Sequence, residues 1–295
     1  MDIETMQHFG LTKELEKADY FETEHYKTML SNVKLAIKSG GIIALTGIVG
    51  IGKTVSLRRI QQAISEENKI LVSKSLVTEK RNVTINTLFT ALFTDLARKK
   101  DGKFPTQPEK RERKLQELIK DLSKPVALFI DEAHNLHSRT LVSLKCLIEL
   151  VQDAPGILAV VIVGHPKLAN DLRNPALEEI GARAKLFEFN PLGTSGSKFI
   201  EWLLKNCSKD KVKPYDILTK EAIDLFVNRL ITPLQIIYYT TRALEKSYQL
   251  GEKPVSLATA QSILSPDLNT IEPNLARHGY NIVALGDYLV TSQTI

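Results

Sequence analysis

Short apolar runs and helically spaced apolar stripes alternate along the first two thirds of the chain. Tyr26, Leu30, Val33 and Ile37 recur every three or four residues, which predicts an amphipathic helix from the Thr23 cap to about residue 38. Continuous apolar runs predict strands buried on both faces, as in a parallel sheet. We expect such strands over residues 42–45, 70–73, 126–130, 157–163 and 184–189. Strands alternating with helices, including one at 136–152, indicate an α/β fold.

The pattern becomes purely helical after Pro191. Gly193, Ser195 and Gly196 mark a linker, and helices are expected over residues 198–206, 219–230, 233–248 and 256–264. We therefore divide the chain into a nucleotide-binding core with an N-terminal segment (1–192), a small all-helical lid (193–265) and a short tail (266–295). In the N-terminal segment, Phe9, Leu11, Tyr20 and Phe21 are expected to anchor onto the core.

A phosphate-binding loop joins the first strand to the helix that follows it. The sequence GIVGIGKT fits the pattern G-x-x-x-x-G-K-[ST], in the strand-to-helix context that the pattern requires. Backbone N–H groups in such a loop surround a polyphosphate, the lysine reaches the terminal phosphates, and the threonine hydroxyl ligates Mg²⁺. We expect ATP and Mg²⁺ as cofactors, bound through Gly47, Gly50, Ile51, Gly52, Lys53, Thr54 and Val55.

Two further polar sites follow apolar strands. Asp131 and Glu132 end the run 126–130, where Asp131 is suited to the Mg²⁺ shell and Glu132 to activating the attacking water. The alternative is a solvated acidic loop. His165 ends the next strand. It either senses the γ-phosphate or is an ordinary turn histidine before Pro166. His134 and His137 are three apart, but without a suitably spaced acidic or cysteine partner we interpret them as surface histidines.

Arg183 lies just ahead of the last strand. An arginine at this position can reach into a neighbouring subunit's site and stabilise charge on the transferred phosphoryl group. A surface salt bridge is the alternative, and Arg173 is the second candidate for the catalytic role.

Composition narrows the class of protein. Hydrophobic residues make up 43% of the 295 residues, and Cys146 and Cys207 are the two cysteines, so a packed core in a reducing compartment is expected. We see no signal peptide and no apolar run long enough to cross a bilayer, which favours a cytoplasmic protein without membrane attachment. The net charge of +5 and the pI near 9.0 are compatible with nucleic-acid binding.

These motifs together resemble the AAA+ ATPases of the ExeA/TnsC/TniB/MuB grouping over about residues 6–265. The similarity rests on Phe9-Gly10-Leu11, LTGIVGIGKT, LFIDEAHNL (128–136), VIVGHPKL (161–168) and Asn190-Pro191-Leu192. The resemblance implies a RecA-like core with a helical lid, and assembly into a ring or helical filament with nucleotide between subunits. Many relatives have a Pro-Arg pair in the lid whose arginine touches the γ-phosphate. Here Pro233-Leu234-Gln235 replaces it, so Gln235 becomes the candidate and hydrolysis is expected to be slow.

Two functions compete within this grouping. Transposition regulators are soluble, bind DNA without sequence preference, and recruit a transposase and a target-selection protein. Secretion-associated ExeA proteins share the core but carry a membrane segment and a cell-wall-binding domain. The segment Ala276-Arg277-His278-Gly279-Tyr280 resembles the tail of transposon-borne members, so we favour transposition. The alternative is an ExeA-like, loader or signalling ATPase that acts on protein partners without DNA.

The resemblance also suggests where double-stranded DNA would bind. In relatives that thread DNA, the contacts follow the second strand, which here gives Lys74, Lys80, Arg81 and Thr84. A second basic window between residues 98 and 114 carries a net charge of +5 and includes Lys99 and Lys103. A solvated charged face is the simpler interpretation of that window.

Overall fold

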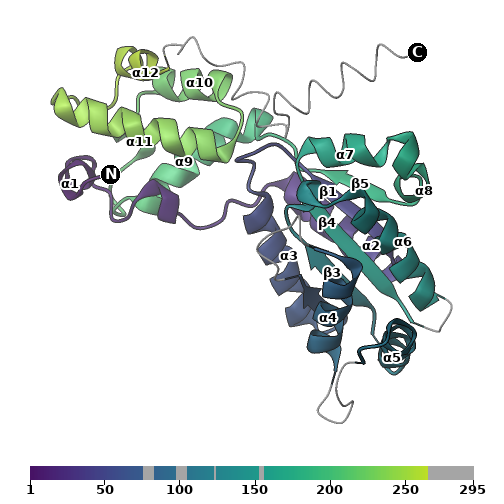
Figure 1. Cartoon of the computed structure of the whole chain (residues 1–295). Helices are drawn as coiled ribbons and strands as arrows, with labels where there is room; N and C mark the ends of the chain where they lie inside the picture. Colours follow the sequence, from purple (N-terminus) through teal and green to yellow (C-terminus); the bar gives the residue numbers. More distant parts are fainter. Residues whose placement is uncertain (76–82, 98–104, 123, 153–155, 265–295) are drawn as a thin grey trace, which may run out of the picture. The chain divides into compact units, whose positions relative to one another are not determined.

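The protein is described as a computed structural model that covers residues 1–75, 83–97, 105–122, 124–152 and 156–264. These residues form two compact units (Figure 1). An α/β unit contains residues 26–48 and the described part of 53–189. A helical unit contains residues 1–25, 49–52 and 190–264. The chain therefore enters the helical unit three times, once within the phosphate-loop sequence.

Five parallel strands form the sheet of the α/β unit, in the order β2-β3-β4-β1-β5. Their bounds are β1 Gly41–Thr46, β2 Leu71–Lys74, β3 Val126–Ile130, β4 Leu158–Gly164 and β5 Lys185–Glu188. Every residue of β3 and β4 is buried, whereas the edge strands β2 and β5 are partly exposed. The continuous apolar runs thus identify the central strands, and the predicted α/β fold with a parallel sheet is confirmed.

Helices cover both faces of this sheet (Figure 1). They are α2 Glu24–Ser39, α3 Lys53–Glu67, α4 Ile85–Leu96, α5 Pro108–Lys120, α6 Ser138–Gln152, α7 Pro166–Leu172 and α8 Glu178–Gly181, with 3-10 turns η4 Ala133–Asn135 and η5 Pro175–Leu177. Alternate strand residues such as Leu128 and Val160 pack with α4, α5 and α6 in one apolar cluster. On the opposite face α3 contacts β2 and β4.

The strand register decides where the loops meet. Thr46 of β1 pairs with Gly164 of β4, and Ile130 of β3 pairs with Ile162 of β4. Because the strands are parallel, the segments that follow β1, β3 and β4 leave from the same edge of the sheet. Ligands of open α/β sheets bind at this carboxyl edge.

The helical unit combines the N-terminal residues of the chain with residues 190–264. It contains α1 Ile3–Phe9, η1 Leu15–Lys17, η6 Gly193–Ser195, α9 Gly196–Cys207, η7 Pro214–Asp216, α10 Lys220–Arg229, α11 Pro233–Gln249 and α12 Leu257–Ile263. Phe9, Leu11 and Leu15 are buried in the same apolar core as α9 to α12. We expected Phe9 and Leu11 to anchor on the nucleotide-binding core, and this was wrong because α9 offers them an apolar face. The helix α1 was not expected.

The predicted helices agree with the structure to within one to three residues. The clearest difference lies after β3, where we expected a helix from residue 136. There α6 begins at Ser138, and the 3-10 turn η4 precedes it. No helix among the described residues combines the length and the apolarity that a membrane span requires. The tail 265–295 lies outside the described residues.

Candidate functional site

The phosphate-loop sequence connects β1 to the first turn of α3. Gly50 and Gly52 have φ angles of 82° and 95°, in the left-handed region that favours glycine. Gly50 is also closely packed, since a Cβ there would lie 2.9 Å from the hydroxyl oxygen of Thr232. Because the helix starts at Lys53, its first backbone N–H groups lack partners within the helix, as an anion site needs.

Lys53 is folded back onto the loop that precedes it. Its Nζ donates hydrogen bonds to the backbone carbonyls of Gly47, at 2.9 Å, and Ile48, at 3.1 Å. The residue is only 7% exposed. Burial lowers the pKa of its ammonium group, and the negative charges of Glu132 and Asp131 partly oppose that shift. Within the part of the chain that the structure describes, this buried cation has neutral carbonyls as its hydrogen-bond partners, so it is well prepared to bind an anion.

Thr54 and Asp131 lie together beside Lys53. The Thr54 hydroxyl donates to Asp131 Oδ2 at 3.2 Å, and the backbone N–H of Glu132 donates to Asp131 Oδ1 at 2.9 Å. A hydroxyl and a carboxylate are the oxygen ligands that Mg²⁺ prefers, and Mg²⁺ commonly keeps water in its remaining positions. The two predicted metal-binding residues are therefore adjacent and fit this ion.

Glu132 occupies the first position after Asp131 with an unusual backbone. Its φ of 55° is in the left-handed region, which non-glycine residues rarely adopt, and its side chain is 41% exposed. The two carboxylates have different partners, since Asp131 accepts from Thr54 while Glu132 lies near His134. Strained backbone of this kind often occurs at functional sites.

His134 and His165 stack on each other at the same edge. Their ring centroids are 3.7 Å apart and the ring planes are inclined by 17°. Burial lowers the pKa of both imidazoles to about 4, and the charge of Lys53 adds to the effect on each. Both rings are therefore neutral at pH 7.

The interpretation of His134 as a surface histidine was wrong. Its side chain is 10% exposed, and its Nε2 lies 3.5 Å from Glu132 Oε2, so an acidic partner is present after all. The sequence spacing concealed this because Glu132 turns sharply and η4 brings His134 back toward β4. His137, in contrast, is exposed as expected.

Arg183 lies where the strands begin, at the end of the sheet opposite the carboxyl edge that carries Lys53. It precedes β5, whose first residue Lys185 pairs with Ile43 near the start of β1. Its Nη1 donates to Glu149 Oε1 at 2.7 Å, and both side chains are exposed. A cavity of about 240 Å³ adjoins the pair and also touches Gly40 and Lys145. Because Lys53 lies at the carboxyl edge, Arg183 does not belong to the nucleotide site of its own α/β unit. Arg173, the second candidate, is exposed at the end of α7.

Gln235 has a local structural role in the helical unit. Its side-chain oxygen accepts hydrogen bonds from the backbone N–H groups of Ile231, at 2.9 Å, and Thr232, at 3.1 Å. The Thr232 hydroxyl in turn accepts from the Gln235 backbone N–H at 3.3 Å. This reciprocal arrangement caps the start of α11.

The predicted DNA-binding residues are only partly described. Lys74 is exposed at the end of β2, and Thr84 caps α4 through a reciprocal bond with Thr87. The other four predicted contacts, Lys80, Arg81, Lys99 and Lys103, lie outside the described residues.

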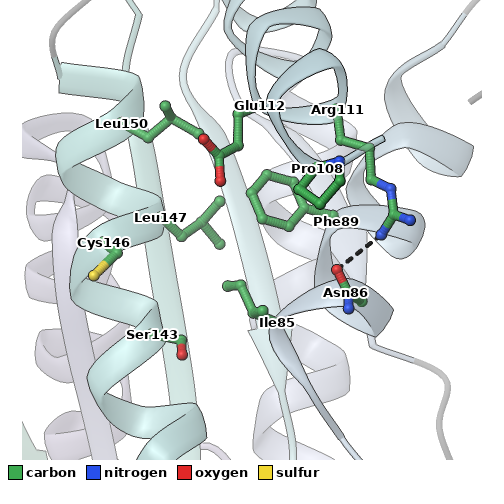
Figure 2. Close-up of a pocket in the computed structure, with 10 residues that line it drawn as sticks. All are labelled: Ile85, Asn86, Phe89, Pro108, Arg111, Glu112, Ser143, Cys146, Leu147 and Leu150. Atoms are coloured by element: carbon green, nitrogen blue, oxygen red, sulfur yellow. Dashed lines mark hydrogen bonds between the residues drawn. The ribbon is translucent and has the colours of Figure 1, made fainter. Parts of the chain in front are cut away.

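The described end of the basic window lines a second cavity of about 330 Å³ between α4, α5 and α6 (Figure 2). Arg111 donates from Nη1 to Asn86 Oδ1 at 2.8 Å and from Nε to the Pro105 carbonyl at 2.9 Å. Its guanidinium therefore ties α5 to α4. Phe89 and Leu147 supply apolar walls between the polar ends of the cavity (Figure 2).

Comparisons with known proteins agree with this architecture. Residues 36–172 match the AAA domain family. General secretion pathway protein A of Aeromonas hydrophila is 27% identical over 173 residues, which cover 55% of this chain and 29% of that protein. The chain therefore spans less than a third of this curated relative.

Three solved structures have a similar fold. Cdc6p of Pyrobaculum aerophilum gives a TM-score of 0.55 at 16% identity, covering 90% of this chain and 73% of that one. The ORC2 protein of Aeropyrum pernix, in ADPNP-ADP complexes, gives 0.56 at 14% identity, with coverage of 97% and 85%. Drosophila ORC bound to DNA gives 0.53 at 16% identity, with coverage of 88% and 64%. The predicted RecA-like AAA+ fold is confirmed.

Proposed function

We propose that this chain is an ATPase that assembles on double-stranded DNA and regulates DNA transposition by recruiting or activating a transposase, together with a target-selection protein. The proposal rests mainly on the side chains that lie together at the carboxyl edge of the sheet. A buried lysine, a hydroxyl–carboxylate pair and a second carboxylate beside a stacked histidine lie there together.

Each residue has a part in the proposed hydrolysis of ATP. Lys53 exchanges its two carbonyl partners for phosphate oxygens, a favourable exchange because charge-assisted bonds are stronger than bonds to neutral carbonyls. Thr54 and Asp131 hold Mg²⁺, which neutralises charge on the phosphates when bound. Glu132 accepts a proton from the attacking water, and His165 contacts that water or the γ-phosphate. Gln235 stays the candidate for the role of the lid arginine, and we expect slow hydrolysis.

Assembly into a ring or filament is supported by the position of Arg183. The side chain lies at the edge of the sheet opposite the phosphate loop, so it cannot complete the site of its own α/β unit. In a head-to-tail oligomer it would enter the neighbour's site and stabilise charge in the transition state. The exposed ion pair with Glu149 contributes at most about 1 kcal/mol, so it is easily exchanged for such a contact.

Binding to DNA is supported by charge and by fold. The chain carries a net charge of +5, Lys74 is exposed at the end of β2, and Thr84 caps the start of α4. Drosophila ORC, which shares the fold, was solved bound to DNA. Lysines and helix N-termini contact phosphates without reading bases, so we expect binding that is insensitive to sequence.

A second function is favoured by one specific observation. The match to General secretion pathway protein A makes an ExeA-like ATPase that acts on protein partners without DNA the alternative. Both functions use the same hydrolytic site, so they differ in the partner that the assembly binds.

The hydrolytic part is tested with Glu132→Gln. This variant keeps the shape of Glu132 and loses the base, so ATP turnover should fall by about 10²- to 10⁴-fold while binding of an ATP analogue stays unchanged. Turnover at the wild-type rate would remove Glu132 from this role. A wild-type protein that neither binds nor hydrolyses ATP would overturn the whole proposal.

The DNA part is tested by measuring affinity for duplex DNA against salt, with and without ATP. Each neutralised phosphate contributes a slope of about −0.9 in log K against log salt. Lys80→Ala/Arg81→Ala should weaken binding to all sequences alike and flatten the slope, and a Lys99→Ala/Lys103→Ala variant is the comparison. Absence of ATP-dependent binding by wild type at low salt would favour the protein-partner function.

A further inference from the structure

Three side chains converge beside the proposed water-activating position. Glu132, His134 and His165 each offer a ligand atom, and these atoms lie within 4.8 Å of one another. The backbone is fitted to this contact at Gly164, where a Cβ would lie 3.1 Å from the backbone nitrogen and 3.4 Å from the Cβ of His134. Contacts between 3.0 and 3.4 Å are tighter than usual, so Gly164 lets η4 approach the end of β4 closely.

A histidine–histidine–glutamate set suggests a zinc site, but the ring geometry opposes it. The lone pair of an imidazole nitrogen lies in the plane of its ring, and a zinc ion must therefore lie close to the planes of both ligating rings. The planes of His134 and His165 are nearly parallel and their centroids are 3.7 Å apart. Planes inclined by only 17° meet far outside the two rings, so one ion cannot be ligated by both rings as they stand.

We propose instead that His134 is a positioning residue for Glu132: its Nε2–H donates to the Glu132 carboxylate, while its ring rests on His165. This role depends on the proposed hydrolysis of ATP, in which Glu132 is the base. His134 would hold the base at a fixed distance from the residue that contacts the γ-phosphate.

The hydrogen-bonding state of the ring supports this assignment. His134 Nδ1 is buried and has no hydrogen-bond partner in the described structure, whereas Nε2 faces Glu132 Oε2 at 3.5 Å. A proton on Nδ1 would leave a buried donor unsatisfied and would turn the Nε2 lone pair toward a carboxylate. A proton on Nε2 leaves Nδ1 as an unpaired acceptor, which costs less than an unpaired N–H donor, and points a donor at the carboxylate. The neutral ring therefore carries its proton toward Glu132.

The exposure of the Glu132 side chain gives the contact with His134 its proposed effect. Glu132 has a φ of 55°, in the left-handed region, and 41% of its side chain is exposed. An exposed glutamate samples several rotamers. A hydrogen bond from His134, whose ring is itself held by stacking on His165, restricts the Glu132 carboxylate. Small losses of alignment at a reacting group reduce rates strongly.

Two substitutions of His134 separate the donor from the stack. His134→Phe keeps an aromatic ring against His165 and loses the donor, so kcat should fall about ten- to hundredfold with unchanged affinity for an ATP analogue. His134→Gln has an amide nitrogen at about the reach of Nε2 and should recover most of that loss. His137→Phe, three residues further on and exposed, is the matched control and should behave as wild type.

A measurement without hydrolysis tests the contact itself. In nucleotide-free protein labelled with ¹⁵N-histidine, long-range ¹H–¹⁵N spectra should show His134 neutral with its proton on Nε2, and Glu132→Gln should move that resonance. A proton on Nδ1, or a His134→Phe variant with wild-type kcat, would overturn the proposal. If wild type does not hydrolyse ATP, the proposed function fails, and the spectra still decide whether His134 holds Glu132.

Discussion

The hydroxyl of Thr54 donates a hydrogen bond to a carboxylate oxygen of Asp131 at 3.2 Å, although 77 positions separate the two residues in sequence. This contact joins the helix after β1 to the turn after β3. The two groups that we assign to Mg²⁺ are therefore positioned by the protein alone. A metal ion entering here would replace one hydrogen bond with two oxygen ligands, and would require little rearrangement of the chain.

Lys53→Met should weaken nucleotide binding without weakening the fold. The ammonium group is buried and desolvated, and replacing a buried charge with an apolar chain of similar length is often neutral or stabilising. We expect binding of a fluorescent ATP analogue to weaken by at least about tenfold, the effect of losing charge-assisted hydrogen bonds. Thermal unfolding checks the fold. Unchanged affinity would contradict the assignment of the loop.

Arg183→Ala should lower ATP turnover while leaving stability and nucleotide affinity nearly unchanged. Its ion pair with Glu149 is exposed and contributes at most about 1 kcal/mol. Glu149→Ala breaks the same pair but keeps the arginine, so it should retain turnover and is the matched control.

Mixing Arg183→Ala with Lys53→Met protein tests action across a subunit boundary. Each variant lacks a different half of the shared site, so mixed oligomers should regain activity that neither variant has alone. Failure to regain activity, where the two are seen to co-assemble, would mean that Arg183 does not act in a neighbour's site.

Gln235→Glu should separate helix capping from nucleotide sensing. Glutamate keeps the side-chain oxygen that accepts from Ile231 and Thr232, so the unfolding temperature should stay at the wild-type value. Gln235→Leu loses the cap and should cost about 0.5–2 kcal/mol of stability. If Gln235 also reaches the γ-phosphate, the negative charge that Gln235→Glu introduces weakens ATP binding more than ADP binding. Equal affinities in wild type and Gln235→Glu would restrict Gln235 to capping.

Stability should fall as the pH drops from about 6.5 to about 4, in part through the stacked histidines. Their folded pKa of about 4 lies below the ordinary 6.5, so the unfolded chain binds more protons in that window. Their contribution is complete above pH 6.5 and is lost as the pH falls through the folded value. Urea unfolding at about pH 7.5 and about pH 5.0 should show a smaller pH effect in His134→Gln/His165→Gln, whereas His137→Gln should match wild type.

The sheet was predictable because its central strands are apolar throughout. The runs at β3 and β4 have no polar alternation, which identifies strands covered on both sides, and the motif GIVGIGKT locates the turn between β1 and α3. Parallel strands then bring Lys53, Asp131 and His165 to one edge, as the sequence predicted.

Local backbone geometry was not predictable in the same way. The left-handed turn at Glu132 and the 3-10 turn after it bring His134 against His165, and neither has a periodic signature. The helix α1 was also missed, because seven residues carry too little periodicity to identify it, although Asp2 caps it by accepting from the Thr5 N–H at 2.7 Å. Roles that depend on a neighbouring subunit, such as that of Arg183, stay predictions.

The helical unit is closed by two stretches of chain that are almost two hundred residues apart. The Thr12 N–H donates to the carbonyl of Cys207 at 2.7 Å, and Leu11 forms an antiparallel bridge with Ser208. During synthesis, Phe9, Leu11 and Leu15 must therefore remain without their apolar partners until α9 has left the ribosome, well after the strands of the sheet have done so. Pairing over such a distance is slow, and unpaired apolar segments aggregate while they wait. Deleting the first seventeen residues would uncover the inner face of α9 and should yield insoluble protein, even though the phosphate loop is untouched.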